Sequence, residues 1–223
     1  GRRESGFGRE GGWEGLQAYA RPRHSSKETL PAIEPKTGKP EPATAEIDRT
    51  PKLFIGGKQA RPDSGYSYPI FSSAGMELGL VGHGNRKDLR NAVEAANSAS
   101  GWAKSTAHLR AQILYYLGEN LAVRSEEFAK RIVSMTGEDL ASATREVELS
   151  IDRLFTYAAW ADKFDGAVHG APIRGVALAM NEPVGIIGVI CPDENPLLGL
   201  VSLIAPALAM GNVVVAIPSE PFP

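Results

Sequence analysis

The side chain in this sequence most able to do covalent chemistry is its single thiol, Cys191. A cysteine becomes a nucleophile when nearby positive charge or a helix terminus lowers the pKa of its thiol. Cys191 directly follows the apolar, β-branched run Val184–Ile190, and a small half-buried cysteine in such a place usually serves packing. We therefore expect Cys191 to be structural, and the nucleophile is the alternative interpretation.

A glycine pattern near the start could in principle hold a phosphate. Residues 6–11 read GFGREG, a formal match to the G-x-G-x-x-G of dinucleotide-binding loops. That motif works only between a strand and a helix. Five residues precede it here and Gly12-Trp13 follows, so the sequence does not support a dinucleotide loop at this place.

The other polar candidates have ordinary structural explanations. No two of the four histidines (His24, His83, His108 and His169) share the spacing of metal ligands, so we expect no metal site. Glu126 and Glu127 suit the first turn of a helix, where carboxylates oppose the positive end of the dipole. We expect Arg145, Glu146 and Glu148 on a solvated helix face. We expect His169 in a loop. The tryptophans Trp13, Trp102 and Trp160 are expected to pack or to lie at interfaces.

Composition excludes several classes of protein. The 223 residues hold 24 Lys and Arg against 26 Asp and Glu, a net charge of −2, which argues against a nucleic-acid binder. One cysteine excludes an intramolecular disulfide framework and a cysteine-rich zinc site, and it fits a reducing compartment. With no signal peptide recognised at the start, we expect a cytoplasmic location.

Proline and aromatic residues divide the chain. Residues 20–53 contain no aromatic residue and six prolines, which favours an extended, solvated backbone. We assign 23–51 to a Pro-rich linker, 1–22 to the end of a preceding module, and 52–223 to a second domain.

The second domain opens with short strands and continues with helices. Leu53–Lys58 indicates a hairpin around a Gly-Gly turn, and further extended segments are expected at Tyr66–Phe71 and Leu78–Val81. Asn85 should cap a first helix, and further helices begin near Thr106 and Ser125. The apolar positions expected along one side of the second helix are Leu109, Ile113, Tyr116, Leu117 and Leu121. The longest helix is expected over Leu140–Phe164, after a stop at Gly137.

The last third of the sequence has a different pattern. Val184–Ile190 and Val213–Ala216 read as buried strands, with an Ala/Leu helix over Leu197–Met210 between them. The uncharged stretch Leu197–Ser219 is long enough for a membrane span, but Pro206 and Gly211-Asn212 divide it. A β-α-β unit of a parallel sheet is the better interpretation, and we expect no membrane association.

Several ordered motifs carry a resemblance to a known family. Residues 1–12, GRRESGFGREGG, with Gly15-Leu16 and Tyr19, closely resemble the carboxy-terminal signature of the aldehyde dehydrogenase superfamily. Residues 52–223 resemble the amino-terminal part of the same superfamily. The matching segments are Leu53–Lys58, Trp102 with Arg110, Thr136-Gly137, Glu146-Val147, Tyr157–Lys163, Glu182–Ile190, Pro196–Leu198, Ala205–Asn212 and Pro218–Glu220.

The order of these motifs, tail before head, resembles the junction of two tandem modules, as in the two-module family 16 of the superfamily. The implied fold is α/β: a Rossmann-type, doubly wound parallel sheet behind an N-terminal helical layer, truncated in this chain. The resemblance implies NAD or NADP as coenzyme. The positions it assigns to coenzyme contact are Ile190, Pro192, Ile217, Ser219 and Glu220.

The family's chemistry joins a cysteine thiolate to an aldehyde and then transfers hydride to the coenzyme. The resemblance places the nucleophile and the general base beyond Pro223, so this chain is expected to have no catalytic residue of its own. Two positions also depart from the family. Glu194 stands where the family's Pro-Trp-Asn-x-Pro pattern has the asparagine that donates to the oxyanion, and an ionised carboxylate cannot donate. Ile217 replaces the lysine that meets the coenzyme ribose, whereas the acid Glu220 is retained.

Two functions follow as hypotheses. The chain is either a piece of an NAD(P)-dependent aldehyde dehydrogenase, inactive by itself, or a non-catalytic module for oligomerisation or protein interaction. The replacements at Glu194 and Ile217 favour the second hypothesis for this module. The partners expected are therefore further copies of the chain or another protein.

Overall fold

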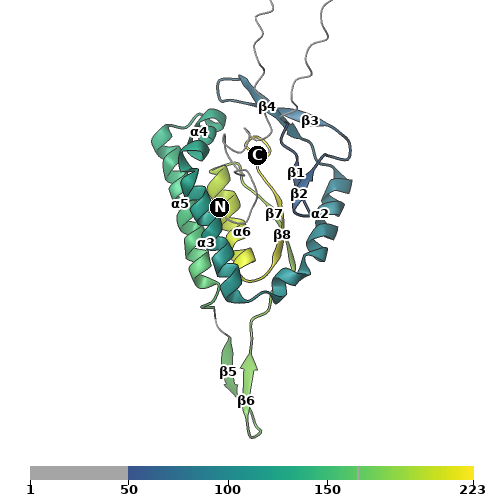
Figure 1. Cartoon of the computed structure of the whole chain (residues 1–223), viewed down its shortest axis with the longest axis vertical. Coiled ribbons are helices and arrows are strands. Elements are labelled where there is room, and N and C mark those ends of the chain that lie inside the picture. Colours follow the sequence, from purple (N-terminus) through teal and green to yellow (C-terminus); the bar gives the residue numbers. More distant parts are fainter. Residues whose placement is uncertain (1–49, 165) are drawn as a thin grey trace, which may run out of the picture. The chain divides into compact units, whose positions relative to one another are not determined.

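The structure, a computed structural model, describes residues 50–164 and 166–223 (Figure 1). The chain divides into two units, Gly1–Glu46 and Ile47–Pro223, and all described residues belong to the second. The predictions for 1–22 and for the linker as far as residue 49 therefore lie outside the described residues.

Two antiparallel hairpins open the second unit. Strands β1 (Leu53–Ile55) and β2 (Lys58–Ala60) meet at a turn in which Gly56 and Gly57 have φ of 63° and 77°. This positive φ favours glycine, and the hairpin confirms the prediction. Strands β3 (Ser67–Phe71) and β4 (Glu77–Gly82) form the second hairpin, close to the predicted segments.

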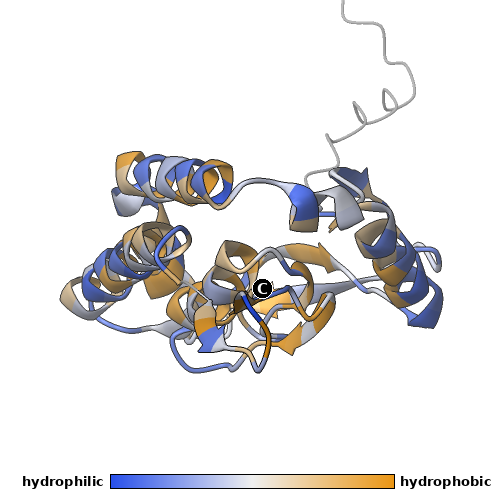
Figure 2. Ribbon diagram, turned by 90° about the horizontal axis from the view of Figure 1, so that it is seen from below, coloured by the Kyte–Doolittle hydropathy of each residue, from blue (hydrophilic) through white to orange (hydrophobic). Residues whose placement is uncertain are grey.

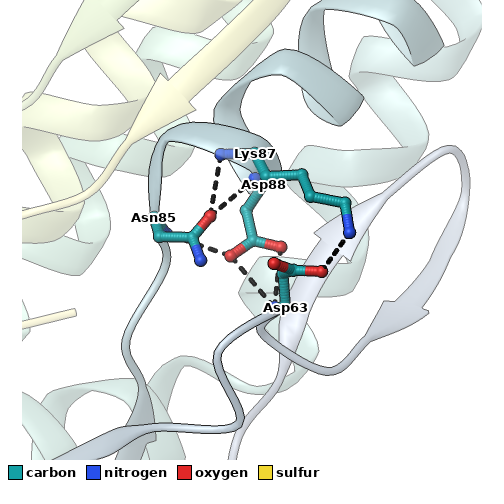
Figure 3. A network of polar contacts seen from close by, with 4 residues as sticks. All are labelled: Asp63, Asn85, Lys87 and Asp88. Carbon is teal, nitrogen blue, oxygen red and sulfur yellow. Dashed lines mark hydrogen bonds and ion pairs between the residues drawn. The ribbon is translucent and has the colours of Figure 1, made fainter.

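Helix α2 (Arg86–Ser98) begins at the predicted cap, Asn85. Its side-chain oxygen accepts from the backbone N–H groups of Lys87 and Asp88, at 2.7 and 3.2 Å, and the Asp88 carboxylate accepts from the Asn85 N–H at 2.9 Å (Figure 3). Such a reciprocal capping box satisfies free donors of the first turn. The same carboxylate accepts from the N–H of Asp63, whose own carboxylate pairs with Lys87, so the network also holds the loop before β3.

The helical layer consists of η1 (Ser100–Lys104), α3 (Ala107–Val123), α4 (Ser125–Thr136) and α5 (Leu140–Trp160). Helix α5 packs against α3 and α4, with Val147, Leu154 and Ala158 buried as predicted. Gly137 ends α4 in the left-handed conformation, with φ of 78°. Helix α5 ends at Trp160 rather than at Phe164, because a turn follows and Phe164 is exposed.

The buried side of α3 differs from the apolar positions that the sequence singled out. Leu109, Ile113, Tyr116 and Leu117 are all more than a third exposed, whereas Leu121 is buried as the sequence pattern would require. The buried positions are Ala111, Leu114, Gly118 and Leu121. The helix is apolar on more than one side, so periodicity could not choose between them, and small residues allow the close approach to α5.

The sequence did not predict one hairpin, formed by β5 (Ala167–Gly170) and β6 (Val176–Ala179). His169, expected in a loop, lies in β5. All eight strand residues are exposed, and Figure 1 shows the hairpin extending away from the helices. The sequence pattern of this hairpin is weak, because each strand has only four residues and Pro172 and Gly175 lie between them.

The last elements form the predicted β-α-β unit. Strands β7 (Ile186–Ile190) and β8 (Val213–Ile217) pair in parallel, and α6 (Pro196–Ala209) connects them. The core is formed by α3, α4, α5 and α6, where Ala205 and Ala209 of α6 are completely buried. Figure 2 shows the hydrophobic colour along the central strands and a mixture of hydrophobic and hydrophilic colours along the outer helices. The uncharged stretch is thus a helix, a turn and a strand.

No helix in the described part of the chain is both long and apolar enough to cross a lipid bilayer.

Candidate functional site

The candidate site lies at the edge of the parallel pair where both strands end. Ile190 and Ile217 are partners in the register and are the last residues of β7 and β8. The Cys191 N–H donates to the Ile217 carbonyl at 2.9 Å and extends the pairing by one bond. In open parallel sheets, ligands bind outside this carboxyl edge. The residues to consider are therefore those of the loops after β7 and β8.

The helix between the strands takes its N-terminal cap from another element. Asn195, the N-cap residue of α6, makes no side-chain cap. Glu146 of α5 supplies it, since its Oε1 accepts from the N–H groups of Leu197 and Leu198, at 2.9 and 3.1 Å. Glu146 is 3% exposed, which corrects the prediction that it lies on a solvated face. A carboxylate at this helix end also opposes the positive end of the dipole.

Burial raises the pKa of the Glu146 carboxyl. The two backbone hydrogen bonds act in the opposite direction, and the charge of Glu138 adds to the rise. The second oxygen, Oε2, is buried without a hydrogen-bond partner. Glu146 therefore occupies the two N–H groups that an external anion would otherwise meet at this helix end.

Two residues of the helical layer hold the other end of α6. The Trp102 indole N–H donates to the Leu208 carbonyl at 3.1 Å, and Arg110 Nε donates to the Ala209 carbonyl at 2.9 Å. The last carbonyls of a helix lack partners within it, and a cation there stabilises the negative end of the dipole. The motif residues Trp102 and Arg110 therefore fix the helix between the two strands.

Asn212 joins the helix to the start of β7. Its side chain is buried, accepts from the Gly185 N–H at 2.9 Å and donates to the Ala207 carbonyl at 3.2 Å. The turn after α6 therefore fixes where β7 begins. The sequence indicated only that Gly211 and Asn212 form a turn.

The loop after β7 is shaped by close packing and by one unusual backbone angle. The side chain of Pro192 lies so near Gly199 of α6 that a Cβ there would be 2.7 Å from its Cγ. Asn195 has φ of 48°, a left-handed value that asparagine tolerates better than most residues. Glu194 is exposed and makes no hydrogen bond or ion pair with a described residue.

The loop after β8 carries the remaining positions assigned to coenzyme contact. Glu220 is exposed, and its carbonyl accepts from the Tyr68 hydroxyl at 3.1 Å. Ser219 is 3% exposed, and its hydroxyl donates to Asp193 Oδ1 at 2.8 Å. Ile217 and Ile190 are 47% and 80% exposed. The structure thus brings the five positions to one edge, while their contact with coenzyme stays a prediction.

Cys191 is buried, at 6% exposure. Burial raises the pKa of its thiol, which lowers the fraction of reactive thiolate. This environment agrees with the expected structural role and opposes the alternative of a nucleophile.

The two loops at this edge carry negative charge. Asp193, Glu194 and Glu220 stand in the two loops, and the sequence contains no Lys or Arg from Gly175 to Pro223. The carboxylates suit the hydroxyl groups of a sugar and repel phosphate groups. Within residues 50–164 and 166–223, no cluster of three His, Cys, Asp or Glu side chains could hold a metal ion.

With this geometry described, comparison with known proteins decides the family. The model of the aldehyde dehydrogenase family matches residues 63–223. This chain belongs to the aldehyde dehydrogenase family. Among its curated relatives, human aldehyde dehydrogenase 1A1 is 35% identical over 181 residues, covering 77% of this chain and 36% of the relative. Hydroxyisobutyraldehyde dehydrogenase of Mycolicibacterium austroafricanum is 34% identical over 173 residues, which cover 76% of this chain and 34% of that protein.

Solved structures give the same result for the fold. Betaine aldehyde dehydrogenase of Staphylococcus aureus in complex with NAD+ matches with a TM-score of 0.76 and 27% identity. The match covers 78% of this chain and 36% of that protein. The chain therefore has an aldehyde dehydrogenase fold over the matched part and spans about a third of the length of its relatives. These matches do not test the narrower resemblance to family 16.

Proposed function

We propose that this chain supplies the adenosine side of a coenzyme site of the aldehyde dehydrogenase family and does not oxidise aldehydes by itself. The observation that carries the proposal is the parallel β7–α6–β8 unit, whose two loops meet at the carboxyl edge. The coenzyme of the solved relative is NAD+, and this coenzyme accepts hydride when it is bound.

The residues present fit the ribose better than the phosphates. Glu220 offers carboxylate oxygens to ribose hydroxyl groups at an exposed position. Ile217 offers apolar surface where the family resemblance places a lysine, and Glu146 already occupies the first N–H groups of α6. We therefore propose binding through Glu220 and contact with the exposed Ile190, Pro192 and Ile217, at lower affinity than a site with the lysine would give.

Two observations support the proposed inactivity. Cys191 is buried with a raised pKa, so its thiolate is scarce near neutral pH. Glu194 is an exposed carboxylate, and at the position to which the family resemblance assigns the oxyanion asparagine it would repel a developing negative charge. We expect no NAD(P)H from a simple aldehyde, and formation that Cys191→Ser abolishes would contradict this part of the proposal.

The test of coenzyme binding is calorimetric titration of NAD and of ADP-ribose into the chain. Both ligands should bind. Glu220→Ala should weaken the binding of both at least about fivefold, because it removes one or two hydrogen bonds to the ribose. Glu182→Ala is the matched control, because Glu182 is an exposed acid before β7 and should leave affinity unchanged. Equal effects of the two substitutions would refute a site at Glu220.

The exposed β5–β6 hairpin favours a second function, a module for oligomerisation or protein interaction. Val168, Val176 and Leu178 are each at least 63% exposed on its strands, and Ile173 is 75% exposed at its turn. An exposed antiparallel pair presents free edges and apolar side chains to another chain. Sedimentation of the chain and of the double variant Val176→Lys, Leu178→Lys tests this. An unchanged distribution of species would exclude the hairpin.

The organisation as a tail, linker and second-module start, with bounds 1–22, 23–51 and 52–223, also stays our proposal, as does the cytoplasmic location. The ordered motifs of residues 1–12 and 15–19 support the first of these. Limited proteolysis that cuts first within residues 23–51 is the expected result, and first cleavage after residue 52 would contradict it.

A further inference from the structure

The two loops at the carboxyl edge are joined directly through side chains. The Ser219 hydroxyl donates to Asp193 Oδ1 at 2.8 Å, linking the segment after β8 to the segment after β7. Ser219 is 3% exposed, so little water reaches its hydroxyl. Asp193 itself is exposed, but its carboxylate makes this a charge-assisted hydrogen bond, which is stronger than one between neutral groups.

Ser219 also shapes the turn that carries Glu220. Its oxygen accepts from the N–H of Phe222 at 3.2 Å, which closes a short turn over residues 219–222. One hydroxyl therefore donates to Asp193 and accepts from Phe222. Movement of Asp193 would be transmitted to the turn through this single atom.

A second contact holds the same turn from the first hairpin. The Tyr68 hydroxyl of β3 donates to the Glu220 carbonyl, and the Tyr68 ring lies edge-on to His83 with centroids 5.7 Å apart. Burial, and then the charge of Glu220, raise the pKa of Tyr68, so its hydroxyl keeps the proton that it donates. Glu220 thus has a backbone held on both sides and a side chain free in solvent.

The contact depends on a residue in which this sequence departs from the family pattern. Asp193 stands where Pro-Trp-Asn-x-Pro has tryptophan. An indole ring has one N–H donor and no acceptor, so it could not take the hydrogen bond from Ser219. The Asp193–Ser219 bond is therefore specific to sequences with an acceptor at this position.

We propose that Asp193 is a positioning residue that holds the Glu220 turn, through Ser219, in the conformation that receives a ribose. The family resemblance assigns the loop after β7 to the substrate oxyanion. Here this loop holds the loop after β8 through the Asp193–Ser219 hydrogen bond, which we call the clamp. The role in ribose binding rests on the proposed function, whereas the clamp itself does not require coenzyme.

The clamp is tested first without coenzyme, by hydrogen exchange of backbone amides in the 223-residue chain. Asp193→Ala should accelerate exchange at Phe222 by about tenfold, the factor for one hydrogen bond of ordinary strength. Asp193→Asn keeps a side-chain oxygen acceptor and should restore slow exchange. Glu194→Ala, a neighbouring exposed acid without a partner, is the matched control and should change nothing. Exchange in Asp193→Ala equal to that of the unmodified chain would overturn the proposal.

Coenzyme binding then tests the route through Glu220. Asp193→Ala should weaken ADP-ribose binding by about three- to tenfold, because the substitution loses only part of the binding free energy of one hydrogen bond to a charged group. Asp193→Asn should restore the affinity. In the Glu220→Ala background, Asp193→Ala should have no further effect, and an additive loss would overturn the positioning role. If no variant binds ADP-ribose while exchange at Phe222 responds as expected, the proposed coenzyme function and the positioning role fail and only the clamp remains.

Discussion

Glu146 is the residue whose removal should most clearly disturb the scaffold beneath the site. Glu146→Ala deletes the acceptor for the N–H groups of Leu197 and Leu198, at 2.9 and 3.1 Å. Asn195 provides no side-chain cap of its own, so both donors lose their partner. The start of α6 and the loop before it should then fray.

The expected loss is worked from these two bonds. Losing an N-terminal cap costs about 0.5–2 kcal/mol, and hydrogen bonds to a charged group contribute about 1.5–3 kcal/mol. Removing a buried carboxylate with one unpartnered oxygen offsets part of this. We expect Glu146→Ala to lower the free energy of unfolding by about 2 kcal/mol, and to lower Tm by about 4–8 °C for a chain of this size.

The dependence on pH follows from the raised pKa of Glu146, for which burial is the main cause. A carboxyl with a raised pKa binds more protons in the folded chain than in the unfolded chain. Its contribution to stability is present below the unfolded pKa and is lost as pH rises through the folded pKa. Glu146→Gln does not titrate, so the unmodified chain should lose stability relative to this variant between about pH 4 and pH 7.

Urea unfolding followed by circular dichroism at both pH values measures these differences. Glu148→Ala is the matched control, since Glu148 is exposed on the same helix and pairs with Arg145 at 3.6 Å. Its effect should stay within about 0.5 kcal/mol. A loss in Glu146→Ala no larger than this would refute the capping role. A gain of the unmodified chain over Glu146→Gln as pH rises would refute the raised pKa.

Three further substitutions or measurements test the packing around the same loops. Gly199→Ala places a Cβ 2.7 Å from the Pro192 ring, so thermal unfolding should show a loss of about 1–3 kcal/mol from overpacking; a stabilised variant would show that the loop yields freely. Asn212→Ala removes the acceptor of the Gly185 N–H and the buried hydrogen bond to the Ala207 carbonyl, and should cost about 1–3 kcal/mol in urea unfolding, whereas a neutral result would mean that water replaces the side chain. Disulfide exchange with an aromatic disulfide at pH 8 should label Cys191 at least about tenfold more slowly in the folded chain than in urea. Equal rates would contradict its burial.

Sequence patterns with one strong local cause predicted the corresponding elements correctly. Asn85 caps α2 because its side chain reaches donors two and three residues ahead. The Gly56-Gly57 turn and Gly137 need positive φ, which glycine adopts without strain. Two β-branched runs around an Ala/Leu helix indicated the β7–α6–β8 unit, and ordered motifs indicated the family.

Long-range contacts decided the features that the sequence left open or assigned wrongly. The sequence predicts a solvated Glu146 because its neighbours Arg145 and Glu148 are charged. In the structure Glu146 accepts a hydrogen bond from the N–H of Leu197, which lies 51 residues further along the chain. The buried side of α3 depends on where α5 lies, since α3 is apolar on more than one side. Local periodicity reports how one element is patterned and carries no information on which partner faces it.

The site shows the same division. The sequence placed Pro192, Ile217 and Glu220 near strand ends, because strands and the turns after them can be recognised locally. Only the folded chain brings Ser219 to Asp193, 26 residues away, and Tyr68 to Glu220, 152 residues away. Hydrogen bonds of this kind are directional and short, so they depend on the packing of whole elements and leave no periodic trace in the sequence.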